Sequence, residues 1–160
     1  MTRIRNQRFS VHLTNQLDAA IAGYQEALKL DPGYQQAHLS LAIALHGKGE
    51  FMKALPSYEV ALSLNPLSHK SRQGFAAALN ASGFYVDAAK EYETLLEKFP
   101  ANTTDELVKD RASAHMDLAG VYASQLKLPD RAKRHYRDAL SLNPNHGQAP
   151  AVRVWLSQNP

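Results

Sequence analysis

The chain has 160 residues, 44% hydrophobic and 21% charged, which is typical of a globular domain with a sizeable core. Its net charge of +3 comes from interleaved acids and bases, so no charged block indicates a nucleic-acid or membrane partner. No segment approaches the ~18 apolar residues of a membrane span, and no signal peptide is evident, so we expect a cytoplasmic protein. The absence of cysteine excludes disulfides and thiolate chemistry.

The N-terminal segment carries no clear helix-pair pattern. Ile4, Phe9, Val11 and Leu13 are expected to form an irregular apolar cap, with the neighbouring arginines in solvent. If they do not cap the chain, the first complete helical face is open to self-association.

A nonapeptide then recurs along the chain. Its copies are YQEALKLDP at 24–32, YEVALSLNP at 58–66, YETLLEKFP at 92–100 and YRDALSLNP at 136–144. The first three closing prolines are 34 residues apart, and the fourth follows 44 residues later. Each copy places small residues and a tyrosine on one helical face. Asp31, Asn65 and Asn143 precede their prolines in the extended conformation that proline favours, so each copy is predicted to be the second helix of a unit.

A matching first helix precedes two of these copies. Leu41, Ala42 and Leu45 mark it in one unit, and the equivalent residues of the next unit lie 34 positions later. Gly49 and Gly83 supply the break between the two helices.

The last unit is longer than the others. Its first-helix pattern is displaced by 43 residues, with nine extra residues before the helix and one more in the turn SQLKLPD. The nine lie in ANTTDELVKD, where Thr103 and Glu106 have the spacing of a capping box. We expect them to lengthen the helix at its N-terminus, with a loop as the alternative.

The C-terminal run QAPAVRVWLSQ predicts a short capping helix over 147–158. Pro150 suits a first helical turn, and Ala151, Val152, Trp155 and Leu156 share one face. The alternative is that Trp155 is a ligand-binding aromatic residue.

With these motifs the chain resembles the tetratricopeptide repeat (TPR) family, whose unit has 34 residues. The resemblance implies an all-α, right-handed superhelical solenoid of antiparallel helix pairs. It predicts one array over 1–160: a degenerate first repeat over 1–34, repeats over 35–68, 69–102 and 103–146, and the capping helix. The residues expected to pack the repeats together are Ala20, Tyr24, Ala27, Leu41, Ala42, Leu45, Ala54, Tyr58, Ala61, Phe75, Ala76, Leu79, Ala88, Tyr92, Leu118, Ala119, Tyr122, Ala132, Tyr136 and Ala139.

The sequence offers no catalytic or metal-binding pattern, so we expect neither enzymatic activity nor a cofactor. The glycines do not form a phosphate-binding loop, and the seven histidines lack the spacing of known metal motifs. His38 and His115 occupy equivalent positions in the second and fourth units, with Arg72 between them, and structural packing is the preferred interpretation.

Function is therefore expected on the concave face that the resemblance assigns to the first helices. The predicted groove residues lie about half a turn from the packing face of each first helix. They are Gln36, Leu39, Ile43, His46, Lys70, Gln73, Ala77, Asn80, Met116 and Gly120. For Leu39 and Ile43, the alternative is burial against a neighbouring first helix or the N-terminal segment.

These features predict a non-catalytic scaffold or adaptor that binds a peptide or helix of a partner protein in the groove. The alternative function is an architectural unit that forms homo-oligomers through its open ends.

Overall fold

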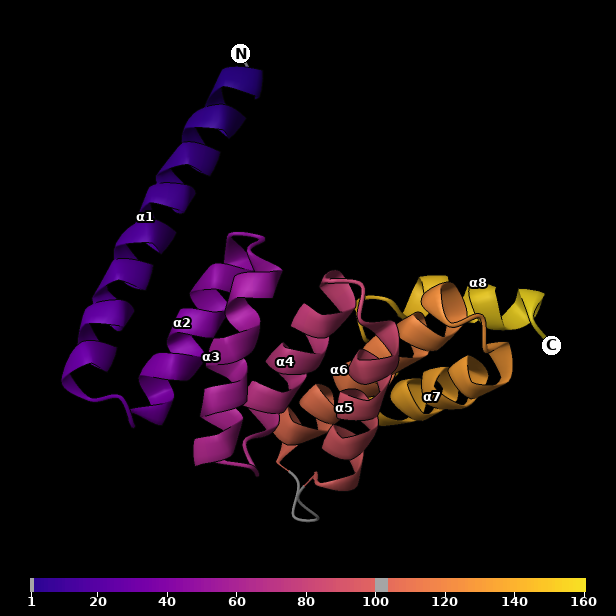
Figure 1. Cartoon of the computed structure of the whole chain (residues 1–160). Coiled ribbons are helices and arrows are strands. Elements are labelled where there is room, and N and C mark those ends of the chain that lie inside the picture. The colour runs from indigo at the N-terminus through magenta and orange to yellow at the C-terminus, as the bar shows by residue number, and fades with distance from the viewer. Residues whose placement is uncertain (1, 100–103) are drawn as a thin grey trace. The chain divides into compact units, whose positions relative to one another are not determined.

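The computed structural model describes the backbone of residues 2–99 and 104–160 and the side chains of residues 15–99 and 104–160. All regular elements in these ranges are helices, which confirms the expected all-α class (Figure 1). The chain forms two compact units, residues 1–78 and 79–160. None of the described helices is both long and apolar enough to cross a bilayer.

The first helix, α1 (Thr2–Leu30), runs without interruption for 29 residues. The expected irregular N-terminal cap is therefore wrong for the backbone, because residues 2–22 contain neither proline nor glycine to break the helix. The apolar side chains assigned to that cap lie outside the described residues. Leu17, Ile21 and Leu28 of α1 pack in the core with α2 (Gln35–Gly47).

The first unit continues with α3 (Phe51–Leu64), which packs against α2 as an antiparallel pair joined by a short turn. The next helix, α4 (His69–Ala81), begins in this unit, and the division between the two units falls within it, after Ala78.

The second unit holds α5 (Tyr85–Glu97), α6 (Asp105–Gly120), a π-helical turn η1 (Val121–Gln125), α7 (Pro129–Leu142) and α8 (Ala149–Gln158). Within it α5 packs on α6, α6 on α7 and α7 on α8. Val152 and Leu156 of α8 contact a small core formed with Met116 of α6 and Ala139 of α7. The C-terminal helix therefore covers apolar side chains of the last helix pair.

The lengthened helix α6 begins at Asp105, N-terminal to Ala112, the position equivalent to Gln35 of α2. Its N-cap is Thr104, whose hydroxyl oxygen accepts a hydrogen bond of 3.3 Å from the backbone N–H of Leu107. The predicted cap, Thr103, lies outside the described residues. The described part of the insertion thus extends the helix rather than forming a loop.

The backbone conformation of the turns between paired helices explains why glycine occurs at positions 49 and 83. Gly49 and Gly83 have positive φ values of 78° and 89°, which favour glycine at a helix C-terminus. In the longer turn of the last unit, Lys127 adopts the left-handed conformation with φ of 55°. The extra residue is accommodated there by the π-helical turn. The backbone hydrogen bond from Leu128 N–H to the Tyr122 carbonyl spans six positions, whereas the equivalent bonds from Glu50 to Leu45 and from Phe84 to Leu79 span five.

The helices that end before prolines share one geometry. Asn65 and Asn143 have φ of −141° and ψ of 87° and 86°, on the extended side that a following proline favours. Their backbone N–H groups close the last turn on the carbonyls of Ala61 and Ala139. Pro100, which is predicted to end the helix of the third copy, lies outside the described residues.

Most side chains expected to pack the repeats are inaccessible to solvent. The buried members are Leu41, Ala42, Leu45, Ala54, Tyr58, Ala61, Ala76, Leu79, Ala88, Tyr92, Leu118, Ala119, Tyr122, Ala132 and Ala139. The half-buried members are Ala20, Tyr24, Ala27, Phe75 and Tyr136.

Gly74 of α4 lies close against the ring of Tyr58 of α3. A Cβ added at Gly74 would lie 2.5 Å from Cε1 of Tyr58 and 2.7 Å from its hydroxyl oxygen. These separations are far below van der Waals contact, and the buried Tyr58 ring has no room to move away. The glycine is therefore required by the tyrosine.

We predict that Gly74→Ala lowers the free energy of unfolding by about 1–3 kcal/mol, because the added methyl group overpacks the contact with Tyr58. Gly23→Ala is the matched control: it also lies in a helix, but nothing is within 4 Å of its added Cβ. This control should raise stability by about 0.5–1 kcal/mol through helix propensity. Urea unfolding of both variants measures the difference, and equal effects would contradict the steric explanation.

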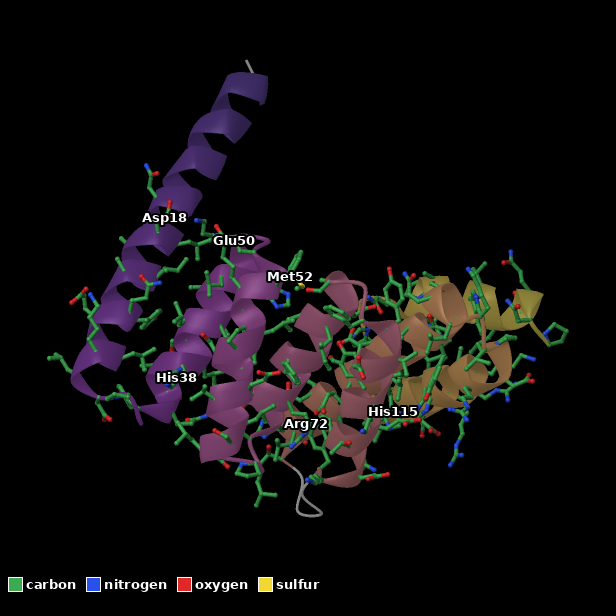
Figure 2. The ribbon with its side chains drawn as sticks, in the orientation of Figure 1. Asp18, His38, Glu50, Met52, Arg72 and His115 are labelled. Atoms are coloured by element: carbon green, nitrogen blue, oxygen red, sulfur yellow. The ribbon has the colours of Figure 1, made fainter. Side chains whose placement is uncertain are left out.

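An ion-pair network joins α1 to the turn after α2. Lys48 Nζ lies 2.5 Å from Asp18 Oδ1 and 2.9 Å from Glu50 Oε1, and Lys53 Nζ lies 2.9 Å from Glu50 Oε2. Figure 2 shows Asp18 of α1 near Glu50, which lies in the turn between α2 and α3. Hydrogen bonds from Lys53 and Lys48 lower the pKa of Glu50 from 4.5 to about 2.

We predict that Glu50→Gln makes stability less dependent on pH in the acidic range. Because the folded protein holds Glu50 ionised below its unfolded pKa, the network stabilises the fold fully above about pH 4.5. That contribution is lost as the pH falls towards about 2. Denaturant unfolding of both proteins at near-neutral and acidic pH tests this: the gap between them should shrink on acidification, and a constant gap would contradict it.

Candidate functional site

The predicted groove residues of the first unit differ sharply in exposure. Leu39 is only 6% exposed and belongs to the core cluster of α1, α2 and α3. Leu39 is therefore not an exposed anchor. It is buried against neighbouring helices, as the alternative interpretation expected. Ile43, one turn further along α2, is 55% exposed. The two residues differ because the helix between them turns by somewhat more than one full circle, which carries Ile43 away from the core.

The exposed part of this site is formed by α2 and α4. Gln36, Ile43 and Lys70 are exposed, whereas Gln73 and Ala77 are half-buried. A hydrogen bond of 3.4 Å from Gln35 Nε2 to Ser71 Oγ links the two helices beside these residues. We call Gln36, Ile43, Lys70, Gln73 and Ala77 the α2–α4 face.

His46 lies at the C-terminal end of α2 and is half-buried. Its ring meets Phe51 edge-on at 4.9 Å between centroids, and burial lowers its pKa. Its Nδ1 atom is buried without a hydrogen-bond partner. The imidazole is thus part of the packing between α2 and α3 more than of the exposed face.

The remaining predicted groove residues lie in the second unit. Met116 is 2% exposed and packs in the core under α8, so it offers no surface to a ligand. Gly120 and Asn80 are half-buried, and the side-chain oxygen of Asn80 is buried without a hydrogen-bond partner.

The equivalent residues His38 and Arg72 have a common structural role. His38 Nε2 lies 2.9 Å from the carbonyl oxygen of Pro32, which can only accept, so the ring nitrogen donates. Arg72 Nη2 donates to the carbonyl oxygen of Pro66 at 3.0 Å. Each side chain therefore satisfies a carbonyl just beyond the end of the preceding helix. His38 and Arg72 are labelled in Figure 2.

His115, the third residue of this set, makes a different contact. Its Nδ1 atom lies 3.0 Å from Nδ1 of His135 and 3.9 Å from Oδ2 of Asp138, both on α7. Burial, together with the neighbouring His135, lowers the pKa of His115 to about 4, and burial also lowers that of His135. Both imidazoles are therefore neutral at neutral pH.

His135 and Asp138 are not among the residues that the sequence predicts for a functional site. Their spacing of i, i+3 places both side chains on one face of a helix. This spacing is the sequence feature that could have indicated a paired site. Their convergence with His115 depends on how α6 packs against α7, and residue spacing within one helix does not predict that packing.

Trp155 has a packing role within the second unit. Its ring meets that of Tyr136 at a tilt of 62° with centroids 5.1 Å apart, and Trp155 is half-buried. An aromatic pair in this geometry is a favourable packing contact, and it holds α8 against α7.

We predict opposite results for two alanine substitutions on α2. Leu39→Ala should lower the free energy of unfolding by about 2–5 kcal/mol, because it leaves a cavity in the core. Ile43→Ala should change it by less than about 0.5 kcal/mol, because its side chain is mostly in solvent. Chemical unfolding of both variants tests the assignment, which would be wrong if Ile43→Ala were the more destabilising.

Comparison with known proteins identifies the repeats. A family model described as TPR repeat matches residues 12–49, and one described as tetratricopeptide repeat matches residues 112–146. A search of curated proteins finds no match.

Several solved structures resemble the chain. MamA superposes with a TM-score of 0.74 and 22% identity, over 84% of this chain and 73% of its own. PilF of Pseudomonas aeruginosa superposes with a TM-score of 0.69 and 22% sequence identity, and the match covers 95% of this chain and 66% of PilF. YrrB, described as a TPR protein with an unusual peptide-binding site, superposes with a TM-score of 0.62 and 20% sequence identity. The match covers 92% of this chain and 87% of YrrB. At these identities the likeness establishes the fold alone, whereas the matched repeat models, together with the 34-residue period, show that the chain contains tetratricopeptide repeats.

Proposed function

We propose that the protein is a non-catalytic interaction module that binds a peptide or helix of a partner protein on the α2–α4 face. The observation that carries this proposal is the exposure of Ile43, a large β-branched side chain that is 55% in solvent on an otherwise well-packed helix. Leu41, Ala42 and Leu45 of the same helix are buried. Ile43 thus has the position of an anchor rather than of a core residue.

The residues around Ile43 suit an extended peptide or a helix. Gln36 and Gln73 supply amide donors and acceptors, Lys70 supplies one cation, and the small Ala77 leaves room for a bulky partner side chain. Because these residues come from packed helices, they need little ordering when a partner docks. The peptide-binding site named for YrrB, a protein of the same fold, supports this class of function by analogy.

The test compares Ile43→Arg with Val154→Arg. Val154 of α8 is the matched control, since it is also β-branched and also 55% exposed, but it lies outside the α2–α4 face. Wild type and both variants are used to capture proteins from a lysate of the source cells, and captured proteins are quantified by mass spectrometry. We expect a partner that wild type and Val154→Arg retain and Ile43→Arg loses.

Binding of the purified partner then gives the magnitude. We expect Ile43→Arg to weaken the dissociation constant at least about tenfold, or about 1.4 kcal/mol, because a charge replaces a central apolar contact. Equal affinity of the two arginine variants would refute the α2–α4 face as the binding site.

Self-assembly is the second candidate, favoured by the length of α1. This helix has 29 residues against 13 in α2, and Figure 1 shows its N-terminal part continuing beyond α2. A helical segment beyond its own partner helix is available to a second copy. Light scattering over a range of concentrations distinguishes the candidates: a mass that increases with concentration, unaffected by Ile43→Arg, would favour assembly through α1.

A further inference from the structure

Three side chains of the second unit converge between α6 and α7. Nδ1 of His115, Nδ1 of His135 and a carboxylate oxygen of Asp138 all lie within 4.8 Å of one another. We propose that this His115–His135–Asp138 cluster binds a divalent transition-metal ion, with Zn²⁺ as the test ion. The site is separate from the α2–α4 face and does not depend on the function proposed for it.

The donor set has the chemistry of such a site. Two imidazole nitrogens and one carboxylate oxygen are borderline ligands that suit Zn²⁺, whereas Mg²⁺ and Ca²⁺ prefer oxygen ligands alone. Three protein ligands leave at least one position on the ion for water or another group.

The short approach of the two histidines is the central observation. Their Nδ1 atoms are 3.0 Å apart, so they either share one proton as donor and acceptor or face a common ion. A common ion requires the Nδ1 lone pairs of both rings. The bridging Nδ1 proton moves to Nε2 of the same ring, which leaves both Nδ1 lone pairs free to coordinate the ion.

The distances require only small adjustments. At Zn–N distances of about 2.0–2.1 Å, tetrahedral ligand atoms lie roughly 3.3 Å apart. The histidine nitrogens must therefore separate slightly from 3.0 Å, and the Asp138 oxygen must approach from 3.9 Å. Rotation of the Asp138 side chain, which is 47% exposed, can supply the second movement.

The two rings are held in place by their surroundings. His115 is 8% exposed, and His135 stacks on Tyr122 with centroids 5.8 Å apart and a tilt of 20°. The hydroxyl of Tyr122 donates to Glu93, and the guanidinium of Arg131 lies 5.5 Å from the centre of its ring. Such preorganisation lowers the cost of assembling ligands around an ion.

The cluster is accessible and its charge does not exclude a cation. It borders a hollow of about 710 Å³ whose lining includes the three carboxylates of Glu93, Glu97 and Asp138. The guanidinium groups of Arg111 and Arg134 line the same hollow and oppose a cation. Glu93 is also paired with Arg131 at 3.9 Å, so attraction of a cation comes mainly from Asp138, whose carboxylate lies 3.9 Å from Nδ1 of His115.

A bound ion would link the two helices of the last repeat. His115 lies on α6 and the other two ligands on α7, so the metal would act as a cross-link between them. Because the ligands come together only in the folded chain, binding would stabilise the fold.

The experiment uses the full chain without a histidine tag. Isothermal titration with ZnCl₂ near neutral pH is carried out on wild type, His135→Gln, Asp138→Asn and the control His38→Gln. His38 caps a helix in the first unit and lies outside the cluster. We expect one ion per chain in wild type and the control, and at least about tenfold weaker binding in the two cluster variants.

Thermal unfolding gives an independent readout. Zn²⁺ should raise the unfolding midpoint of wild type and His38→Gln, and should have little effect on His135→Gln and Asp138→Asn. Absence of binding by wild type would overturn the proposal. So would equal affinity of all four proteins, because the ion would then bind other histidines. Circular dichroism of each variant without metal verifies that both cluster variants are folded.

Discussion

In the first unit, a large ring packs against a position without a side chain, and this contact sets how α3 meets α4. The Tyr58 ring occupies the space that a Cβ of Gly74 would need, so α3 and α4 approach more closely than ordinary side chains allow. The tyrosines of the later copies are placed similarly in the sequence, and Tyr92 is almost fully buried. Tyr58 and Tyr92 are thus large buried side chains beside completely buried alanines of the same helices, and neighbouring helices can stack on them.

This packing constrains where the chain can vary. The last unit has additional residues, yet the core positions Leu118 and Ala119 remain buried. The described part of the insertion extends α6, and the additional turn residue is absorbed by the π-helical turn and by Lys127 in a left-handed conformation. The π-helical turn carries Tyr122, which stacks on His135. A local irregularity that preserves the repeat thereby also fixes one ring of the His115–His135–Asp138 cluster.

The same position in three repeats illustrates how context changes the chemistry of a side chain. His38 and Arg72 donate to proline carbonyls at the end of the preceding helix, where a cationic or neutral donor is equally suitable. His115 faces His135 instead, where an imidazole nitrogen can accept a hydrogen bond or coordinate a metal and a guanidinium cannot. Equivalence in a repeat alignment therefore predicts location and backbone, but not the partner of the side chain.

The sequence by itself determined the type of repeat, the helix pairs and most of the core, because a 34-residue period repeats the same local pattern of alanine, tyrosine, glycine and proline. It did not determine which side of α2 remains exposed: Leu39 and Ile43 share one helical stripe, but only Ile43 is in solvent. It also predicted an irregular cap at the N-terminus, where the backbone of α1 is a continuous helix. The tertiary structure decided these points and assembled the His115–His135–Asp138 cluster, since burial and convergence depend on contacts between helices, whereas periodicity describes only one helix at a time.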